Sequence, residues 1–352
     1  MGKIRVLVVD DSVVFRKILT DVINEDPLLE VAGAAANGRI ALAKLTQINP
    51  DLVILDVEMP ELDGLSTLKE IRRTHPKLPV VMFSALTERG ALATLEALSL
   101  GASDYFAKPA SAAGTEVTLA VVRDQLIPKV KALAATQSKA PSLATFRSAP
   151  TAMPTSERVD IVAIGCSTGG PNALAEIFAK LPASLPVPIV IVQHMPPMFT
   201  RLLAERLTAQ FAIPVAEGAP GTVLTPGQAW IAPGDHHMIV ARDGLRTRLM
   251  LHQDPPENSC RPAVDVLLRS VAVAYGANSL SVILTGMGQD GLRGCERLRS
   301  LGAQILAQDE ASSVVWGMPG FVARAGLADR ILPLNQIADE ITSRVRAERR
   351  IR

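Results

Sequence analysis

A serine lies in a glycine-rich turn that is typical of enzymes with a serine nucleophile. The turn reads GCSTG over residues 165–169, after an apolar segment at 159–164 and before a helical pattern. At a strand-to-helix turn, this G-x-S-x-G pattern exposes the serine hydroxyl beside backbone N–H groups that can hold an oxyanion. A phosphate-binding loop would need a lysine where Pro171 stands. The remaining alternative is that Ser167 only caps the following helix.

A histidine and an aspartate could supply the other two groups that a catalytic serine needs. His194 follows the strand-like segment 189–193, and Asp290 follows the strand-like segment 279–284. The carboxyl ends of parallel strands meet at one edge of a sheet, so we expect both side chains near Ser167. A histidine there can take the serine proton while the aspartate fixes its tautomer.

The stretch around Asp290 also fits a dinucleotide-binding loop. Residues 286–291 match G-x-G-x-x-G, and Asp309 follows the next strand-like segment. An aspartate inside such a loop would repel a pyrophosphate, and only about 60 residues remain to complete a nucleotide-binding fold. The triad is the favoured interpretation, and the nucleotide site stays open as an alternative.

A second cluster of polar side chains lies at strand ends in the first third of the chain. Asp10 and Asp11, Asp56, Ser84 and Lys108 each follow an apolar segment. Neighbouring carboxylates repel one another unless a hard divalent cation binds, and oxygen ligands with few protein contacts favour Mg²⁺. A carboxylate beside such an ion and a lysine can accept a phosphoryl group. The alternative is that these residues are helix caps and solvated strand ends.

Alternating strand and helix patterns must position these residues. Strands are predicted at 4–9, 29–34, 52–55, 80–83 and 105–107, and then at 159–164, 189–193, 228–231, 279–284 and 304–307. Helical patterns in the first part lie near 13–24, 39–47, 64–74, 88–100 and 117–134. Near-continuous apolar strands separated by helices favour parallel sheets covered on both faces. We therefore expect two α/β domains.

The segment 133–158 separates these two parts. It is rich in Ala, Ser, Thr and Pro and has few large apolar residues, so it cannot bury enough surface to offset its ordering entropy. We predict a flexible linker there.

Composition excludes several classes of protein. Lys+Arg total 36 and Asp+Glu total 35, so no bulk basic charge favours nucleic acid. No apolar run approaches the ~20 residues of a membrane helix, and no signal peptide is recognisable. Three separated cysteines cannot form a disulfide framework. We expect a cytoplasmic protein that binds no nucleic acid and does not insert into a membrane.

The first part resembles the receiver domains of two-component response regulators. The similarity rests on VLVVDDS at 6–12, LVILDVEMPELDG at 52–64, Ser84 with the next alanine, and YFAKP at 105–109. It implies a flavodoxin-like fold with a five-stranded parallel sheet and phosphorylation that depends on Mg²⁺. It also implies that Asp56 accepts the phosphoryl group and that Asp10, Asp11, Asp56 and the Glu58 backbone hold the Mg²⁺ ion. Ser84 and Lys108 would contact the phosphoryl group, and Tyr105 would be the switching aromatic residue.

The second part resembles the chemotaxis protein-glutamate methylesterase (CheB) family. The matching motifs are GCSTGGP, VQHMP, APGDHHM, RPAVDVLL, LTGMGQDG and WGMPG. The resemblance implies a doubly wound α/β esterase domain with a triad of Ser167, His194 and Asp290. Thr168 and the backbone of Met287 would line the site, with Met287 as an oxyanion donor.

Together these resemblances imply a domain order and a function. Residues 1–125 would be the receiver, 126–158 a terminal helix and linker, and 159–352 the catalytic domain. Its reactions would be hydrolysis of glutamate methyl esters and deamidation of specific glutamines on methyl-accepting chemoreceptors, without a metal in the esterase step. Phosphorylation by a chemotaxis histidine kinase would activate it by uncovering the esterase cleft. The alternative is a receiver joined to a non-enzymatic docking domain.

Overall fold

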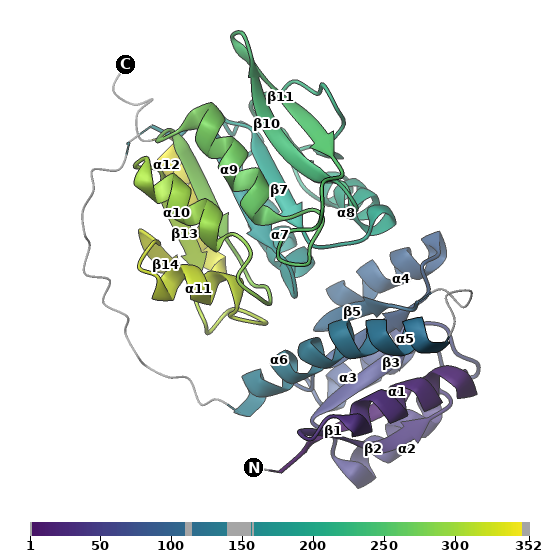
Figure 1. Ribbon diagram of the computed structural model, residues 1–352. Coiled ribbons are helices and arrows are strands. Elements are labelled where there is room, and N and C mark those ends of the chain that lie inside the picture. Colours follow the sequence, from purple (N-terminus) through teal and green to yellow (C-terminus); the bar gives the residue numbers. More distant parts are fainter. Residues whose placement is uncertain (1, 110–114, 139–155, 157, 347–352) are drawn as a thin grey trace. The chain divides into compact units, whose positions relative to one another are not determined.

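The protein consists of two compact α/β units. The structure, a computed structural model, describes residues 2–109, 115–138, 156 and 158–346. Contacts between residues divide the chain into units of residues 1–142 and 143–352 (Figure 1). Each unit contains a parallel sheet with helices packed against it, which confirms the predicted α/β class.

The first unit has a five-stranded parallel sheet with the order β2-β1-β3-β4-β5. Its strands are β1 (Ile4–Val9), β2 (Leu29–Ala35), β3 (Leu52–Asp56), β4 (Val80–Ser84) and β5 (Asp104–Ala107). Every residue of β3 and β4 is buried, as expected for strands covered on both faces. The chain order changes direction between β1 and β3, and ligands of such sheets bind outside the carboxyl ends of the strands at this point.

Four helices of this unit begin at capping side chains. They are α1 (Val13–Glu25), α2 (Gly38–Ile48), α3 (Gly64–Thr74) and α4 (Glu88–Ser99). Ser12, Asn37, Asp63 and Thr87 are the N-caps, and each accepts a hydrogen bond from a backbone N–H. This arrangement satisfies a donor that the helix itself leaves unpaired. The caps are therefore different residues from the acidic cluster.

The helical segment after β5 is longer than predicted. It comprises α5 (Thr115–Val121), a π-helical turn (Val122–Leu126) and α6 (Ile127–Ser138). Leu133 and Ala134 are buried, so the helix continues where the linker was expected to begin. Most of the predicted linker, residues 139–155 and 157, lies outside the described residues.

The second unit has a seven-stranded parallel sheet with the order β14-β13-β12-β6-β7-β9-β8. Its strands are β6 (Ile161–Cys166), β7 (Ile189–Gln193), β8 (Val215–Glu217), β9 (Ala229–Ile231), β12 (Ser279–Ile283), β13 (Gln304–Gln308) and β14 (Arg330–Leu332). Five of them match predicted strands. The sequence analysis missed β8 and β14, which are short and only partly buried. Strand β9 is equally short, but all three of its residues are apolar and buried.

Helices and a hairpin surround this sheet. The helices are α7 (Gly170–Phe178), α8 (Pro197–Gln210), α9 (Val264–Tyr275), α10 (Leu292–Ser300), α11 (Met318–Arg324) and α12 (Leu334–Arg346). Helices α9 and α10 pack against each other, and α7 packs against α12. The antiparallel strands β10 (His237–Asp243) and β11 (Arg246–His252) form a hairpin that packs on α9 (Figure 1). The sequence analysis did not predict this hairpin.

None of the helices in the described part of the chain is both long and apolar enough to cross a membrane.

Candidate active site and phosphorylation site

Ser167 lies in the turn between β6 and α7. Its backbone N–H donates to the Thr285 carbonyl over 3.0 Å, and its carbonyl accepts from the Gly170 N–H over 2.8 Å. The N-cap of α7 is Gly169 in a left-handed conformation, with φ of 79°. Ser167 therefore does not cap this helix, and its half-buried hydroxyl is left for another role.

His194 and Asp290 come together at the edge of the sheet where Ser167 lies. Strand β6 pairs with β7 on one side and β12 on the other, and Cys166 pairs with Gln193 in the register. Ser167 and His194 thus follow paired residues of neighbouring strands. His194 Nε2 lies 2.8 Å from Asp290 Oδ2. No hydrogen bond joins Ser167 to the His194 ring in the part of the chain described here.

The Asp290 carboxylate is buried and surrounded by donors. Besides His194, it accepts from Asn258 Nδ2 and from three backbone N–H groups, those of Val264, Asp265 and Gly291, over 2.6–3.0 Å. Val264 and Asp265 begin α9, so the positive end of that helix faces the carboxylate. Burial raises the pKa of Asp290, but His194 and the backbone donors outweigh it and hold the pKa below its usual value. The side chain is therefore ionised.

The His194 imidazole is held from two sides. Nδ1 lies 3.5 Å from the sulfur of Cys260, opposite the nitrogen that contacts Asp290. Burial lowers the pKa of His194, but the hydrogen bonds to Asp290 and Cys260 outweigh it and raise the pKa to about 10. The site consequently stabilises an imidazolium, which is the species formed when histidine takes a proton from serine.

Two backbone N–H groups beside Ser167 are available to an oxyanion. Among the described residues, neither the Thr168 N–H nor the Met287 N–H donates a hydrogen bond. Thr168 is buried, and its carbonyl accepts from Thr285 Oγ1 over 2.9 Å. Met287 lies in the loop after β12, next to Gly286. The two predicted oxyanion donors are thus not bonded to other groups of the described chain.

The dinucleotide alternative is not supported at this loop. Asp309 would have to bind a ribose, but its Oδ1 accepts hydrogen bonds from the Ser312 N–H and Oγ over 2.9 and 2.6 Å. Asp290 places a buried carboxylate where a pyrophosphate would approach.

The sequence analysis missed three residues that shape this site. Cys260 and Asn258 contact His194 and Asp290 from a turn before α9. Gly286 packs so closely on Ser167 that a Cβ there would lie 2.8 Å from Ser167 Cβ. The pattern G-x-G-x-x-G marked Gly286 but suggested a different role, and no local pattern marks the other two.

In the first unit, the three predicted carboxylates lie close together. One oxygen from each of Asp10, Asp11 and Asp56 can be chosen so that all three lie within 4.8 Å of one another. Asp10 and Asp56 are buried, whereas Asp11 is exposed. Because the helix caps are Ser12 and Asp63, the capping alternative does not explain this cluster. Three oxygen donors with one open side fit a Mg²⁺ ion that keeps several waters.

Lys108 bridges two of these carboxylates. Its Nζ lies 2.7 Å from Asp56 Oδ2 and 2.8 Å from Asp10 Oδ2, and it also lies over the rings of Phe15 and Phe83 at 5.0 and 5.1 Å. Burial and the charge of Asp10 raise the pKa of Asp56 to about 6, against the opposing effect of Lys108. Burial lowers the pKa of Lys108, but the two carboxylates have the larger effect and raise this pKa above its usual value.

Two other predicted receiver residues differ in their contacts: the Ser84 hydroxyl does not bond to the carboxylates, whereas the Glu58 backbone does. The Ser84 hydroxyl is buried and donates to the carbonyls of Gly90 and Ala85 over 3.1 and 3.3 Å. The Glu58 N–H hydrogen bonds to the Asp56 carboxylate, while the Glu58 side chain pairs with Arg89.

Tyr105 is buried in β5, and burial raises its pKa well above the usual value. Lys129 of α6 lies over its ring at 5.5 Å and donates to its carbonyl over 2.8 Å. The predicted switching residue therefore contacts α6, the last helix of this unit.

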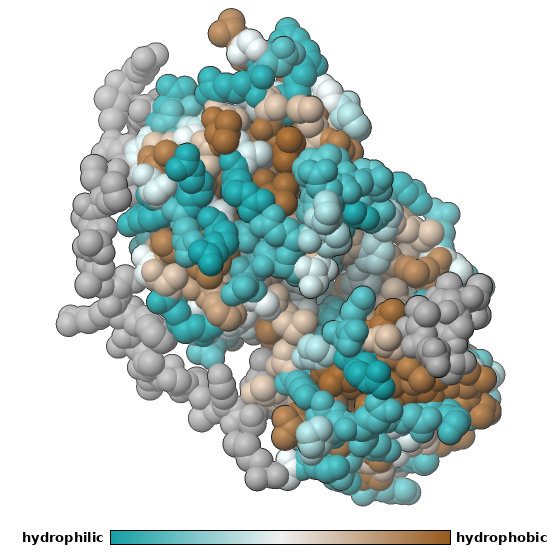
Figure 2. All heavy atoms as spheres, viewed as in Figure 1, coloured by the Kyte–Doolittle hydropathy of each residue, from teal (hydrophilic) through white to brown (hydrophobic). Residues whose placement is uncertain are grey.

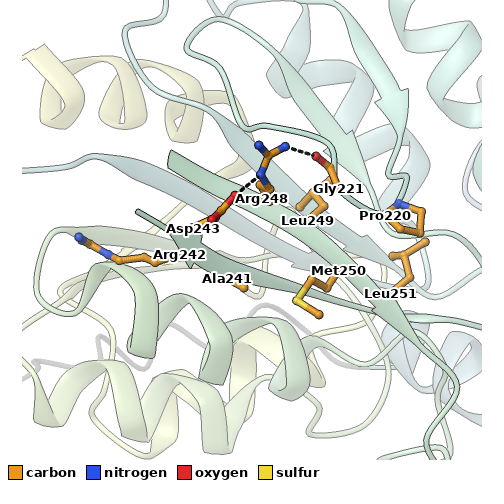
Figure 3. A pocket seen from close by; sticks show the side chains of 9 residues that line it. All are labelled: Pro220, Gly221, Ala241, Arg242, Asp243, Arg248, Leu249, Met250 and Leu251. Atoms are coloured by element: carbon orange, nitrogen blue, oxygen red, sulfur yellow. Dashed lines mark hydrogen bonds and ion pairs between the residues drawn. The ribbon is translucent and has the colours of Figure 1, made fainter. Parts of the chain in front are cut away.

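A pocket of about 410 Å³ lies elsewhere, on the β10–β11 hairpin (Figure 3). Arg248 crosses it and bonds to Asp243 and to the Gly221 carbonyl. Figure 2 shows apolar atoms at the tip of the same hairpin, where Leu245 is fully exposed. None of the three candidate catalytic residues lines this pocket.

Comparisons with known proteins match each of the two units to a different family model. The CheB methylesterase family model matches residues 162–341, and the response regulator receiver domain model matches residues 6–119. A protein of Trichodesmium erythraeum named protein-glutamate methylesterase/protein-glutamine glutaminase is 56% identical over 98% of this chain and 100% of its own length. A protein of Nocardioides sp. with the same name is 50% identical over 99% of this chain and 97% of its own.

A solved structure is also similar to the second unit. The CheB methylesterase catalytic domain of Thermotoga maritima aligns with a TM-score of 0.52 and 40% identity, and the alignment covers 53% of this chain and 98% of that one. The relatives extend over nearly the full sequence, and both family models match. The chain therefore belongs to the CheB methylesterase family, with a receiver domain before the esterase domain.

Proposed function

We propose that this chain removes methyl groups from glutamate methyl esters of chemoreceptors and deamidates specific glutamines there. The observation that carries the proposal is the His194–Asp290 pair at the edge of the sheet where Ser167 follows β6. The likeness to proteins named methylesterase/glutaminase over nearly the whole chain supports it. The non-enzymatic docking alternative is not favoured, because it gives these three residues no common role.

The proposed reaction begins when the Ser167 hydroxyl attacks the ester carbonyl and His194 takes its proton. Asp290 holds the ring and stabilises the imidazolium, and the N–H groups of Thr168 and Met287 donate to the oxyanion. Methanol, or ammonia from a glutamine, leaves with the proton from His194. Water then releases the glutamate by the same route. No metal takes part in the esterase step.

We infer that phosphorylation of Asp56 regulates this reaction. Asp10, Asp11, Asp56 and the Glu58 backbone would hold a Mg²⁺ ion, which neutralises charge on the incoming phosphoryl group. Lys108 is already at the Asp56 carboxylate. Ser84 would leave its bond to Gly90 to contact the phosphoryl group, and Tyr105 would then repack. A chemotaxis histidine kinase is the proposed donor, and the cytoplasm is the proposed location.

The experiment that tests this function measures methanol release from membranes that carry methylated cognate receptors. The full chain is assayed with and without a small-molecule phosphodonor, beside Asp56→Asn. We expect the phosphodonor to stimulate release by the wild type and to leave Asp56→Asn unstimulated. If the folded wild type releases no methanol under either condition, the proposed function is wrong.

We expect a chain shortened to residues 158–352 to release methanol faster than the unphosphorylated full chain. The reason is that the proposed receiver would restrain the esterase until Asp56 is phosphorylated. Rates of both chains are compared at equal concentration with the same receptor membranes. Equal or slower release by the shortened chain would contradict restraint by the receiver.

Gly286→Ala tests how closely the serine must be positioned. A Cβ at this residue would lie 2.4 Å from Met318 Sδ and 2.8 Å from Ser167 Cβ. Because a displacement of about 1 Å can cost roughly 100-fold in rate, we expect the kcat of methanol release to fall by about 10- to 100-fold.

Gly276→Ala is the matched control for this variant. A Cβ there meets nothing within 4 Å, although φ is 56°, so it lowers stability without moving Ser167. Thermal melting of both variants shows how much stability each has lost, so that a fall in kcat beyond this loss can be assigned to the displacement of Ser167. If Gly286→Ala keeps the wild-type kcat, the packing on Ser167 is not needed for catalysis.

A further inference from the structure

The three cysteines of the chain lie in different surroundings. Cys166 and Cys295 are completely buried, and burial raises the pKa of both thiols, that of Cys295 to about 12. Cys260 is only half-buried. Since a reactive cysteine needs both access and a means of losing its proton, Cys260 is the thiol to examine.

Cys260 forms a continuous chain of polar contacts with two proposed catalytic residues. Its sulfur lies 3.5 Å from His194 Nδ1, and His194 Nε2 lies 2.8 Å from Asp290. A thiol beside an imidazole that is supported by a carboxylate is the arrangement that activates cysteine nucleophiles. The imidazolium that this site stabilises lies beside the sulfur, so it can pair with the thiolate formed when the thiol loses its proton to water.

A tight turn fixes the thiol in this position. Glu257 and Cys260 exchange two backbone hydrogen bonds of 3.1 and 2.9 Å. Asn258 and Ser259 between them have φ of 52° and 61°, a conformation that costs energy in residues other than glycine. Asn258 Nδ2 also bonds to Asp290 and Asp265. The same turn therefore holds both Cys260 and the Asp290 carboxylate.

We propose that Cys260 is a modification site for hydroperoxides and alkylating electrophiles, and that its modification switches off the esterase. In the oxidation, the thiolate sulfur attacks one oxygen of hydrogen peroxide and the O–O bond breaks. Hydroxide leaves and combines with the proton that the thiol gave to water, so that Cys260–SH and H₂O₂ give Cys260–SOH and water. Sulfur is oxidised and peroxide is reduced.

The loss of activity follows from where the new group lies. The S–OH group is beside Nδ1, the ring nitrogen that Asp290 leaves free. The thiol already contacts this nitrogen at 3.5 Å but is a weak donor. The O–H of the oxidised cysteine is a stronger donor and holds the lone pair that must accept the Ser167 proton. Reduction by an added thiol restores Cys260 and frees the ring. This consequence rests on the proposed function, whereas the reactivity of Cys260 does not.

The reactivity is tested first, without an activity assay. The folded full chain is treated with limiting iodoacetamide, and mass spectrometry gives the labelling rate of each cysteine. We expect Cys260 to react at least tenfold faster than Cys166 and Cys295, and we expect His194→Gln to slow Cys260 labelling by roughly tenfold. Equal labelling of the three cysteines, or an unchanged rate in His194→Gln, would overturn the proposal.

The effect on the enzyme is tested next. Wild type, Cys260→Ala and Cys295→Ala are treated with hydrogen peroxide, and methanol release is expressed relative to each protein's own untreated rate. We expect a loss of at least tenfold, reversed by dithiothreitol, in the wild type and Cys295→Ala but not in Cys260→Ala. Equal fractional loss in all three, or oxidised Cys260 with full activity, would refute the switch. If no untreated protein releases methanol, the proposed function fails while the labelling result stands.

Discussion

Replacing Ser167 with alanine is expected to lower phosphodonor-stimulated methanol release by roughly 10⁴-fold or more, because the variant lacks the group that attacks the ester. The structure supports this size of effect. Ser167 does not cap α7, and its backbone is fixed by the bonds to Thr285 and Gly170, so removal of the hydroxyl leaves the turn intact. Methanol release from methylated receptor membranes is the measurement, with circular dichroism to verify folding.

Ser300→Ala is the matched control for this experiment. Ser300 is at the end of α10, where its hydroxyl donates to the Arg297 carbonyl, and we expect wild-type release from this variant. If Ser167→Ala keeps more than about one tenth of the stimulated release, Ser167 is not the nucleophile. A protein that acts by docking would keep its activity in this variant, because docking does not need the Ser167 hydroxyl.

Replacing Asp290 with asparagine is expected to lower kcat/KM by roughly 10³- to 10⁴-fold and to shift its pH dependence. His194 must be neutral to accept the serine proton, so activity rises as pH increases through the pKa of His194. Burial lowers that pKa, but the hydrogen bonds to Asp290 and Cys260 outweigh it and raise the pKa to about 10. Loss of the negative charge lowers the pKa, so the rise in the variant's residual activity moves to lower pH.

The measurement is methanol release from about pH 6, near the ordinary pKa of histidine, to about pH 11, beyond the pKa of His194 in the wild type. Asp243→Asn serves as control, since Asp243 is an exposed hairpin residue that pairs with Arg248. We expect this control to keep the wild-type pH profile. An Asp290→Asn profile with its rise at the wild-type pH would show that Asp290 does not set the protonation of His194.

Much of the fold could be predicted because parallel strands bury both faces. Strand β1 matches its predicted bounds, and the other four strands of the first sheet match within one residue at each end. Strands of this kind are short apolar runs that need no long-range information. The hairpin was missed although it carries a local signal. Asp243 pairs with Arg246 across the two-residue turn of Gly244 and Leu245, and Gly244 has the positive φ of 60° that such turns favour.

The candidate site was predictable to the extent that it depends on strand ends. Ser167, His194 and Asp290 follow three neighbouring strands, and the topology alone brings such residues to one edge. Cys260 and Asn258 lie on a turn before α9 that no strand positions. Their contacts depend on left-handed backbone conformations and on bonds to residues about 30 or more positions away, so no local pattern could reveal them.

The orientation of the Ser84 hydroxyl was also beyond prediction. Its place at the end of β4 follows from the strand pattern, but its bond to the Gly90 carbonyl depends on how α4 packs.

The way in which Asp290 is solvated has a consequence for the height of the reaction barrier. In water, a carboxylate beside a newly formed cation is stabilised only after solvent dipoles have turned. Here the dipoles around Asp290 belong to the amides of α9 and to Asn258, and they already point at the carboxylate. When His194 gains a proton, the surroundings need little reorganisation energy. The folding of the chain has thus oriented these dipoles before any substrate arrives.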